Sequence, residues 1–169
     1  DAAKHLIGLG RKRIAYLGDA NSHYPEFHDR YRGLAETMVA AGLEADPRLQ
    51  VDATNSQEAG YEAAQQLIAS GAEFDAIFTA SDTIAIGAMK ALWEAGLSIP
   101  EDVAIIGFDD LPAASMTHPP LTTIQQDYRR AGELLVDSLL AMIRNQPVSE
   151  QVLPARLVVR ESCGAKLQV

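Results

Sequence analysis

The sequence lacks most features that are typical of secreted, membrane-spanning or nucleic-acid-binding proteins. It has one cysteine, Cys163, in 169 residues, so no internal disulfide can form, and we expect a reducing, cytoplasmic compartment. No apolar run approaches the roughly 20 residues of a membrane span. Basic residues are scarce as well, because 14 Lys and Arg against 23 Asp and Glu give a net charge of −9. Duplex binding needs clustered cations, so we expect no nucleic-acid surface on this chain and no membrane contact.

Motifs typical of catalytic or cofactor sites are also missing. The chain has no GxxxxGK[ST], GxSxG, HxxxH or CxxC motif, and its four histidines show no metal-ligand spacing. Gly8 and Gly10 begin like a dinucleotide loop, but Arg13 stands where the third glycine belongs. We therefore expect no cofactor, no metal and no enzymatic activity. One alternative stays open, in which Asp109 and Asp110 hold Mg²⁺ in a small flavodoxin-like enzyme.

The length and composition fit one globular domain. Hydrophobic residues make up 47% and charged residues 22% of the chain, which is ordinary for a folded protein. The sequence begins at Asp1 rather than at a methionine, within a stretch of helical periodicity. We therefore expect a fragment of a longer protein.

Two kinds of apolar segment alternate along the chain. Short continuous runs are typical of strands buried on both faces, and longer segments with apolar residues every three or four positions are typical of amphipathic helices. The predicted strands span 13–17, 48–51, 75–79, 103–108, 121–124 and 152–159, and the predicted helices span 2–9, 29–41, 58–70, 82–95 and 128–144. This alternation predicts an α/β fold with three layers, in which helices cover both faces of a doubly wound parallel sheet.

In such a sheet, ligands bind beyond the carboxyl ends of the strands. Polar and aromatic side chains gather in or beside three segments there, 18–28, 80–82 and 108–111. They suit a polyhydroxylated ligand, because arginine and carboxylates make paired hydrogen bonds to hydroxyls and aromatic rings cover the apolar side of a sugar. The predicted ligand-binding residues are Tyr24, Phe27, Arg30, Ser81, Asp82 and Asp109.

Simpler structural roles compete with this interpretation. Ser81 or Asp82 caps the following helix, since a side-chain oxygen there satisfies free amide groups. Asp110 caps or turns the next loop, so the ligand role falls to its neighbour nearer the strand. The two aromatic residues fit equally well as anchors of their loop.

A series of short motifs runs in order through nearly the whole chain: 30–33 (RYRG), 76–88 (AIFTASDTIAIGA), 100–110 (PEDVAIIGFDD), 119–124 (PPLTTI) and 157–164 (LVVRESCG). Together they resemble the lac-repressor family of bacterial transcription regulators. The resemblance implies a core like that of type I periplasmic binding proteins, with a small effector, often a sugar and sometimes a purine, bound between two lobes. It implies effector contacts at Arg30, Ser81, Asp109 and Gln126, and it implies that the loop 19–29 helps to select the effector.

The resemblance also implies a division of the chain between the lobes. Residues 1–126 correspond to the C-terminal lobe, residues 127–153 to a helix that crosses into the N-terminal lobe, and residues 154–169 to the returning strand and tail. The crossing helix carries six large apolar side chains, each worth roughly 1.5–3 kcal/mol on burial. We predict that it packs on another chain or folds back on its own lobe. An apolar side left bare to solvent in a single chain would contradict this prediction.

Family members sense an effector and change their affinity for DNA through a helix-turn-helix domain, which lies outside this sequence. We therefore predict the sensing part of a homodimeric repressor that binds operator DNA. A periplasmic sugar-binding protein of a transporter is the alternative. The predicted dimer contacts lie on the helix 83–95 and the loop 111–118, at Ile86, Met89, Trp93 and Met116.

Overall fold

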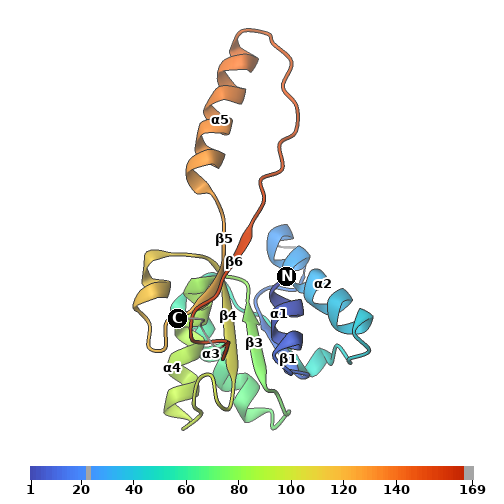
Figure 1. Cartoon of the computed structure of the whole chain (residues 1–169), viewed down its shortest axis with the longest axis vertical. Coiled ribbons are helices and arrows are strands. Elements are labelled where there is room, and N and C mark those ends of the chain that lie inside the picture. Colours follow the sequence, from blue (N-terminus) through green and yellow to red (C-terminus); the bar gives the residue numbers. More distant parts are fainter. Residues whose placement is uncertain (22–23, 166–169) are drawn as a thin grey trace.

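Six strands form one sheet whose spatial order, β2-β1-β3-β4-β5-β6, departs from the order along the chain (Figure 1). The computed structural model describes residues 1–21 and 24–165, so residues 22 and 23 of the predicted loop 19–29 and the last four residues of the predicted tail 154–169 lie outside the described residues. The strands are β1 Ile14–Leu17, β2 Gln50–Val51, β3 Ala76–Thr79, β4 Ala104–Asp109, β5 Thr122–Gln125 and β6 Arg156–Val158. The helices are α1 Ala2–Gly8, α2 Pro25–Ala40, α3 Gln57–Ala69, α4 Asp82–Glu94 and α5 Tyr128–Ile143, with short 3₁₀ turns at Pro47–Leu49 and Pro112–Met116.

The predicted three-layer α/β fold is confirmed. Strands β1 to β5 pair in parallel, α1 and α2 lie on one face of the sheet, and α3 and α4 lie on the other (Figure 1). All residues of β1 and β3 are buried, because both faces are covered. Strand β6 differs from the parallel pattern and pairs antiparallel with β5, with Leu157 opposite Ile124.

Helix α2 begins four residues earlier than predicted. Pro25 occupies its first turn, where a missing amide proton costs nothing and a fixed φ favours the helix. The predicted loop is therefore shorter, and Phe27 becomes a helical residue that packs into the core at 5% exposure.

Helices α3 and α4 approach each other backbone to backbone. A Cβ atom added at Gly60 would lie 2.2 Å from the carbonyl oxygen of Ile84, and one added at Gly87 would lie 1.9 Å from that of Gln57. Only glycine permits this approach. The close contact fixes α4 against α3 and thereby sets where the first residues of α4 meet the sheet edge.

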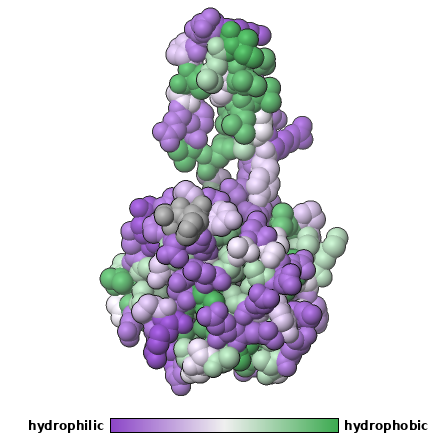
Figure 2. Space-filling model, turned by 180° about the vertical axis from the view of Figure 1, so that it is seen from behind, coloured by the Kyte–Doolittle hydropathy of each residue, from purple (hydrophilic) through white to green (hydrophobic). Residues whose placement is uncertain are grey.

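Helix α5 stands apart from the sheet, joined to it through β5 and β6 (Figure 1). It has no buried residue, and Leu135, Met142 and Ile143 are 72%, 63% and 68% exposed. Apolar side chains gather on this projecting part in Figure 2. The prediction that the helix packs on another chain or folds back is therefore wrong for the single chain, because its apolar side is bare to solvent. Among the described residues, no helix combines the length and apolar character needed to cross a membrane.

One predicted dimer contact is excluded by burial. Met89 lies on the inner side of α4 and is fully buried in the core, so its side chain cannot touch a second chain. Trp93 and Met116 are 45% and 81% exposed, and Ile86 is half-buried. Their role in a dimer stays a prediction.

We expect Gly87→Ala to lower the free energy of unfolding by about 1–3 kcal/mol, because the added methyl group forces α3 and α4 apart. Gly33→Ala is the matched control: it also lies inside a helix, but a Cβ there meets nothing within 4 Å. The control should gain about 0.5–1 kcal/mol from helix propensity. Urea unfolding measures both changes, and equal behaviour of the two variants would refute the packing argument.

Candidate functional site

Arg30, one of the predicted ligand-binding residues, lies over the carboxyl ends of the strands. Its guanidinium carbon lies 3.6 Å from the centre of the Phe108 ring, and its Nη1 donates a hydrogen bond to the carbonyl oxygen of Ala80. A guanidinium stacked on an aromatic face is held in one plane, with its remaining N–H groups directed outward. Burial lowers the pKa of Arg30, and the negative charge of Asp109 opposes that shift.

Asp109 ends β4 beside this guanidinium. Its Oδ1 accepts a hydrogen bond of 3.0 Å from Nε2 of Gln126, and its carbonyl oxygen accepts one of 3.1 Å from the hydroxyl of Tyr128. Burial raises the pKa of Asp109, while nearby hydrogen bonds and the charge of Arg30 act in the opposite direction. The structure thus brings together Arg30, Asp109 and Gln126, three of the predicted ligand-binding residues. A planar cation, a carboxylate and an amide at one sheet edge can bind neighbouring hydroxyl groups.

Two other predicted ligand residues are used inside the protein. Ser81 is 1% exposed; its hydroxyl donates to Oδ1 of Asn55 at 2.6 Å and accepts the amide of Ile84, as the cap of α4. Asp82 has no exposed surface, and its carboxylate accepts hydrogen bonds from the amide of Leu111 and the hydroxyl of Thr123. The prediction that both side chains contact ligand is corrected by this burial.

The two aromatic residues predicted to bind ligand, Tyr24 and Phe27, differ in their exposure to solvent. Phe27 is buried, and its carbonyl oxygen accepts a hydrogen bond of 2.7 Å from the hydroxyl of Tyr16, so it is an anchor of the fold. Tyr24 is 42% exposed, with its ring centre 5.5 Å from that of Phe27. Only the ring of Tyr24 is therefore available at the surface.

The paired aspartates face different partners. Asp110 accepts hydrogen bonds of 2.6 Å from both Arg160 and Gln125, whereas Asp109 is bound to Gln126. Carboxylates arranged in this way do not share one ion, so the geometry gives the magnesium alternative no support. Within the described residues, no group of three or more His, Cys, Asp or Glu side chains could hold a metal ion.

Three residues at this edge were missed by the sequence reasoning. Phe108 was given no contact although it lies in the predicted segment 108–111; its last-but-one position in β4 leaves it half-buried under Arg30. Tyr128 was assigned only to the helix, yet its hydroxyl reaches Asp109. Asn55 was given no role at the site, yet it lies at the surface beside the head of α4, because Ser56 caps α3. The sequence held one signal for this role of Asn55: the next residue is Ser56, which can cap the helix in its place.

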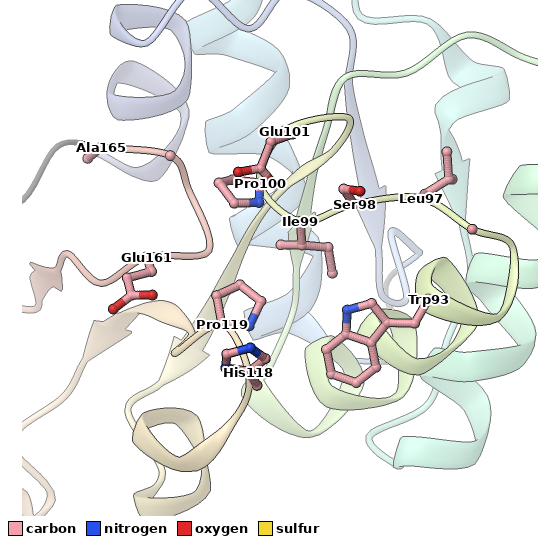
Figure 3. A pocket seen from close by; sticks show the side chains of 12 residues that line it. Trp93, Leu97, Ser98, Ile99, Pro100, Glu101, His118, Pro119, Glu161 and Ala165 are labelled. Atoms are coloured by element: carbon pink, nitrogen blue, oxygen red, sulfur yellow. The ribbon is translucent and has the colours of Figure 1, made fainter.

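A pocket of about 750 Å³, shown in Figure 3, is lined by none of these residues. Its lining comes from the segments that precede β4 and β5, including Pro100 and Pro119, and from Trp93 at the end of α4. It therefore opens near the amino ends of these strands. None of the predicted ligand-binding residues lines it.

The burial of Asp82 predicts a pH dependence of stability. Desolvation raises its pKa from 3.8 to about 6, although the hydrogen bonds from Thr123 and Leu111 oppose the shift. The folded state thus holds the proton more tightly than the unfolded state. The contribution of Asp82 to the free energy of unfolding is therefore fully present below pH 4. It falls by up to about 3 kcal/mol as the pH rises through about 6.

We expect Asp82→Asn to remove this loss. The difference in unfolding free energy between the variant and the native chain should shift by about 3 kcal/mol in favour of the variant between pH 4 and pH 7. Asp137→Asn, at an exposed position of α5, serves as the control for a lost surface carboxylate. Chemical denaturation at the two pH values tests this, and parallel curves for all three proteins would contradict it.

The comparisons with known proteins agree with this geometry. The profile of the periplasmic binding protein-like domain family matches residues 3–163. The HTH-type transcriptional repressor PurR of Haemophilus influenzae (strain PittEE) is 36% identical over 167 residues, which are 95% of this chain and 49% of the relative. The ribose operon repressor of Escherichia coli (strain K12) is 34% identical over 164 residues, which are 97% of this chain and 49% of the relative.

Solved structures show the same relationship. The lac repressor dimer bound to operator and the anti-inducer ONPF superposes with a TM-score of 0.88 at 32% identity, over 97% of this chain and 49% of that chain. The chain spans about half the length of the curated relatives it matches. On the evidence of fold, motifs and these matches, the chain belongs to the periplasmic binding protein-like domain family, in the form found in transcription regulators of the lac-repressor family.

Proposed function

We propose that this chain is the greater part of one lobe of an effector-sensing core, and that it binds a small polyhydroxylated ligand at the carboxyl edge of its sheet. The observation that carries the proposal is the pair formed by Arg30, stacked at 3.6 Å on Phe108, and Asp109, held at 3.0 Å by Gln126. Donors and an acceptor in fixed positions suit the adjacent hydroxyls of a sugar ring. Tyr24 contributes an exposed ring beside them.

The charges at this edge favour a neutral sugar over a phosphorylated effector. Carboxylates follow three of the strands, with Asp19 after β1, Asp52 after β2 and Asp109 at the end of β4. Arg30 already donates to Ala80 and stacks on Phe108. An edge with this acidic excess repels a phosphate group.

Binding would act on DNA through a shift between two arrangements of the lobes. An effector held between lobes stabilises the arrangement it fits better, and it shifts the equilibrium only by that difference in affinity, commonly about 1–3 kcal/mol. In the whole protein, DNA-reading heads paired in a homodimer would respond to this shift, as befits a cytoplasmic repressor. The dimer bound to operator described for the lac repressor supports this scheme.

The bare apolar side of α5 supports the proposed division of the chain. Residues 1–126 and 154–169 would belong to one lobe, while residues 127–153 would contribute α5 to the other. Its exposed apolar side chains then pack on strands that lie outside this chain. This accounts for the helix that stands free of its own sheet (Figure 1).

We expect Arg30→Met to weaken effector binding about 10- to 100-fold, because it removes charge-assisted hydrogen bonds worth roughly 1.5–3 kcal/mol but keeps an apolar stem over Phe108. Arg32→Met is the control, since Arg32 is exposed on the same helix and pairs with Asp29. Isothermal titration with D-ribose, D-glucose, adenine and D-ribose 5-phosphate, on the longest natural polypeptide that contains the chain, provides the measurement. Binding of the phosphate or the purine alone would overturn the choice of a neutral sugar.

We expect Leu139→Ser to lower the free energy of unfolding by about 2–4 kcal/mol in that natural polypeptide. In the 169-residue chain, where Leu139 is 58% exposed, the free energy of unfolding should hardly change. Asp137→Ser, on the polar side of α5, should be neutral in both proteins. Thermal and urea unfolding compare the four cases. If Leu139→Ser were neutral in the longer protein as well, α5 would not be covered by a second lobe.

A further inference from the structure

The turn that follows β4 adopts a disfavoured backbone conformation. Asp109 has φ 116° and Asp110 has φ 55°, so two consecutive residues with side chains lie in the left-handed region that favours glycine. Such a conformation persists only where the surrounding contacts hold it in place. Neither the capping of α4 nor the effector contact at Asp109 explains what holds this turn.

One side of the turn is held by Asp82, at the head of α4. Its Oδ2 accepts the amide proton of Leu111 at 2.7 Å, and its Oδ1 accepts the hydroxyl proton of Thr123 at 2.5 Å. The carboxylate reaches this position because β4 has a glycine beneath it. A Cβ atom at Gly107 would lie 2.1 Å from Oδ1 of Asp82.

The other side is held through Asp110. Its amide donates to Oγ1 of Thr123 at 3.3 Å, and its carboxylate accepts hydrogen bonds of 2.6 Å from Gln125 and from Arg160. The Asp110 and Arg160 side chains are only 10% and 20% exposed, so water competes little for this ion pair. Arg160 is itself fixed by a hydrogen bond of 2.8 Å to the carbonyl oxygen of Leu121.

We propose that Asp82 and Asp110 are positioning residues for Asp109, which hold the turn from both sides so that the Asp109 carboxylate faces the effector beside Arg30 and Gln126. The inference rests on the proposed role of Asp109 as an effector contact. Neither positioning residue touches the ligand. Thr123 joins the two halves, since its hydroxyl donates to Asp82 and accepts from the amide of Asp110.

The arrangement also joins the effector contact to the strands that lead to α5. Arg160 follows β6, by which the chain returns from that helix, and Gln125 ends β5, by which the chain leaves the sheet. Gln125 in turn accepts a hydrogen bond of 2.6 Å from Nε of Arg156 in β6. A displacement of either strand is therefore transmitted to the backbone that carries Asp109.

Deuterium exchange of a peptide covering 108–113, in the full chain without effector, tests whether the contacts hold the turn. Thr123→Val removes the joining hydroxyl and keeps the shape of the side chain, so we expect the amides of Asp110 and Leu111 to exchange at least tenfold faster. Thr117→Val is the control, because the hydroxyl of Thr117 is partly buried but donates only to the carbonyl oxygens of Ala114 and Pro119. Asp82→Ala should behave like Thr123→Val, and Asp82→Asn, which keeps an acceptor for Leu111, should restore protection.

A second readout separates positioning from plain stability. A pH titration of the Asp109 carboxyl carbon by NMR should give a pKa at least half a unit lower in Thr123→Val than in the native chain, because the freed side chain regains water. Thr117→Val should leave it unchanged. Exchange of peptides from β1 and β3 reports whether each variant folds, and Thr123→Val carries the test if Asp82→Ala does not fold.

Unchanged exchange at 108–113 in Thr123→Val would overturn the proposal. Faster exchange with an unaltered Asp109 titration would overturn it too, because the contacts would then hold the turn without positioning the carboxylate. Both readouts are made without effector. They can therefore fail while effector binding succeeds, and the reverse result would refute the proposed function alone.

Discussion

The buried carboxylate of Asp82 is the contact on which the rest of this structure depends. It lies without exposed surface between α4, β4 and β5, where a charge is costly unless hydrogen bonds replace its water. Two things let it sit there: the missing side chain of Gly107 and the close packing of α3 on α4 through Gly60 and Gly87. Core packing and site geometry are thus parts of one arrangement, because the helix that covers the sheet also fixes the turn after β4.

The distribution of charge gives the same edge its chemical character. Arg30 is stacked and hydrogen-bonded in a region where acidic side chains follow several strands. The overall charge of −9 disfavours binding of nucleic acid by this chain. Under the proposed function, an effector at this edge would control DNA affinity without a direct contact, by shifting the equilibrium between arrangements of the lobes.

Helix α5 shows how local structure and tertiary packing can separate. Asp127 caps it through a hydrogen bond of 2.8 Å to the amide of Arg130, and its periodicity is that of an amphipathic helix. Its apolar side nonetheless meets no partner within the described residues. An amphipathic helix obtains most of its stability from tertiary packing, so α5 lacks, in the part of the chain that the structure describes, the contacts that usually stabilise such a helix.

The sequence by itself determined the alternation of strands and helices, the three layers, and the sheet edge at which Arg30 and Asp109 meet, whereas Gln126 was expected there only from the family resemblance. Periodicity and glycine stops carry that information, because they act between residues close in the chain. Only the tertiary structure decided that Ser81, Asp82 and Met89 are buried, that Asp110 turns toward Arg160, and that β6 runs antiparallel. These outcomes depend on contacts between residues far apart in sequence: Asp82 with Thr123, 41 positions away, and Asp110 with Arg160, 50 positions away. A local pattern can place a carboxylate at a strand end, but the partners that its oxygens find are set by how the distant segments pack.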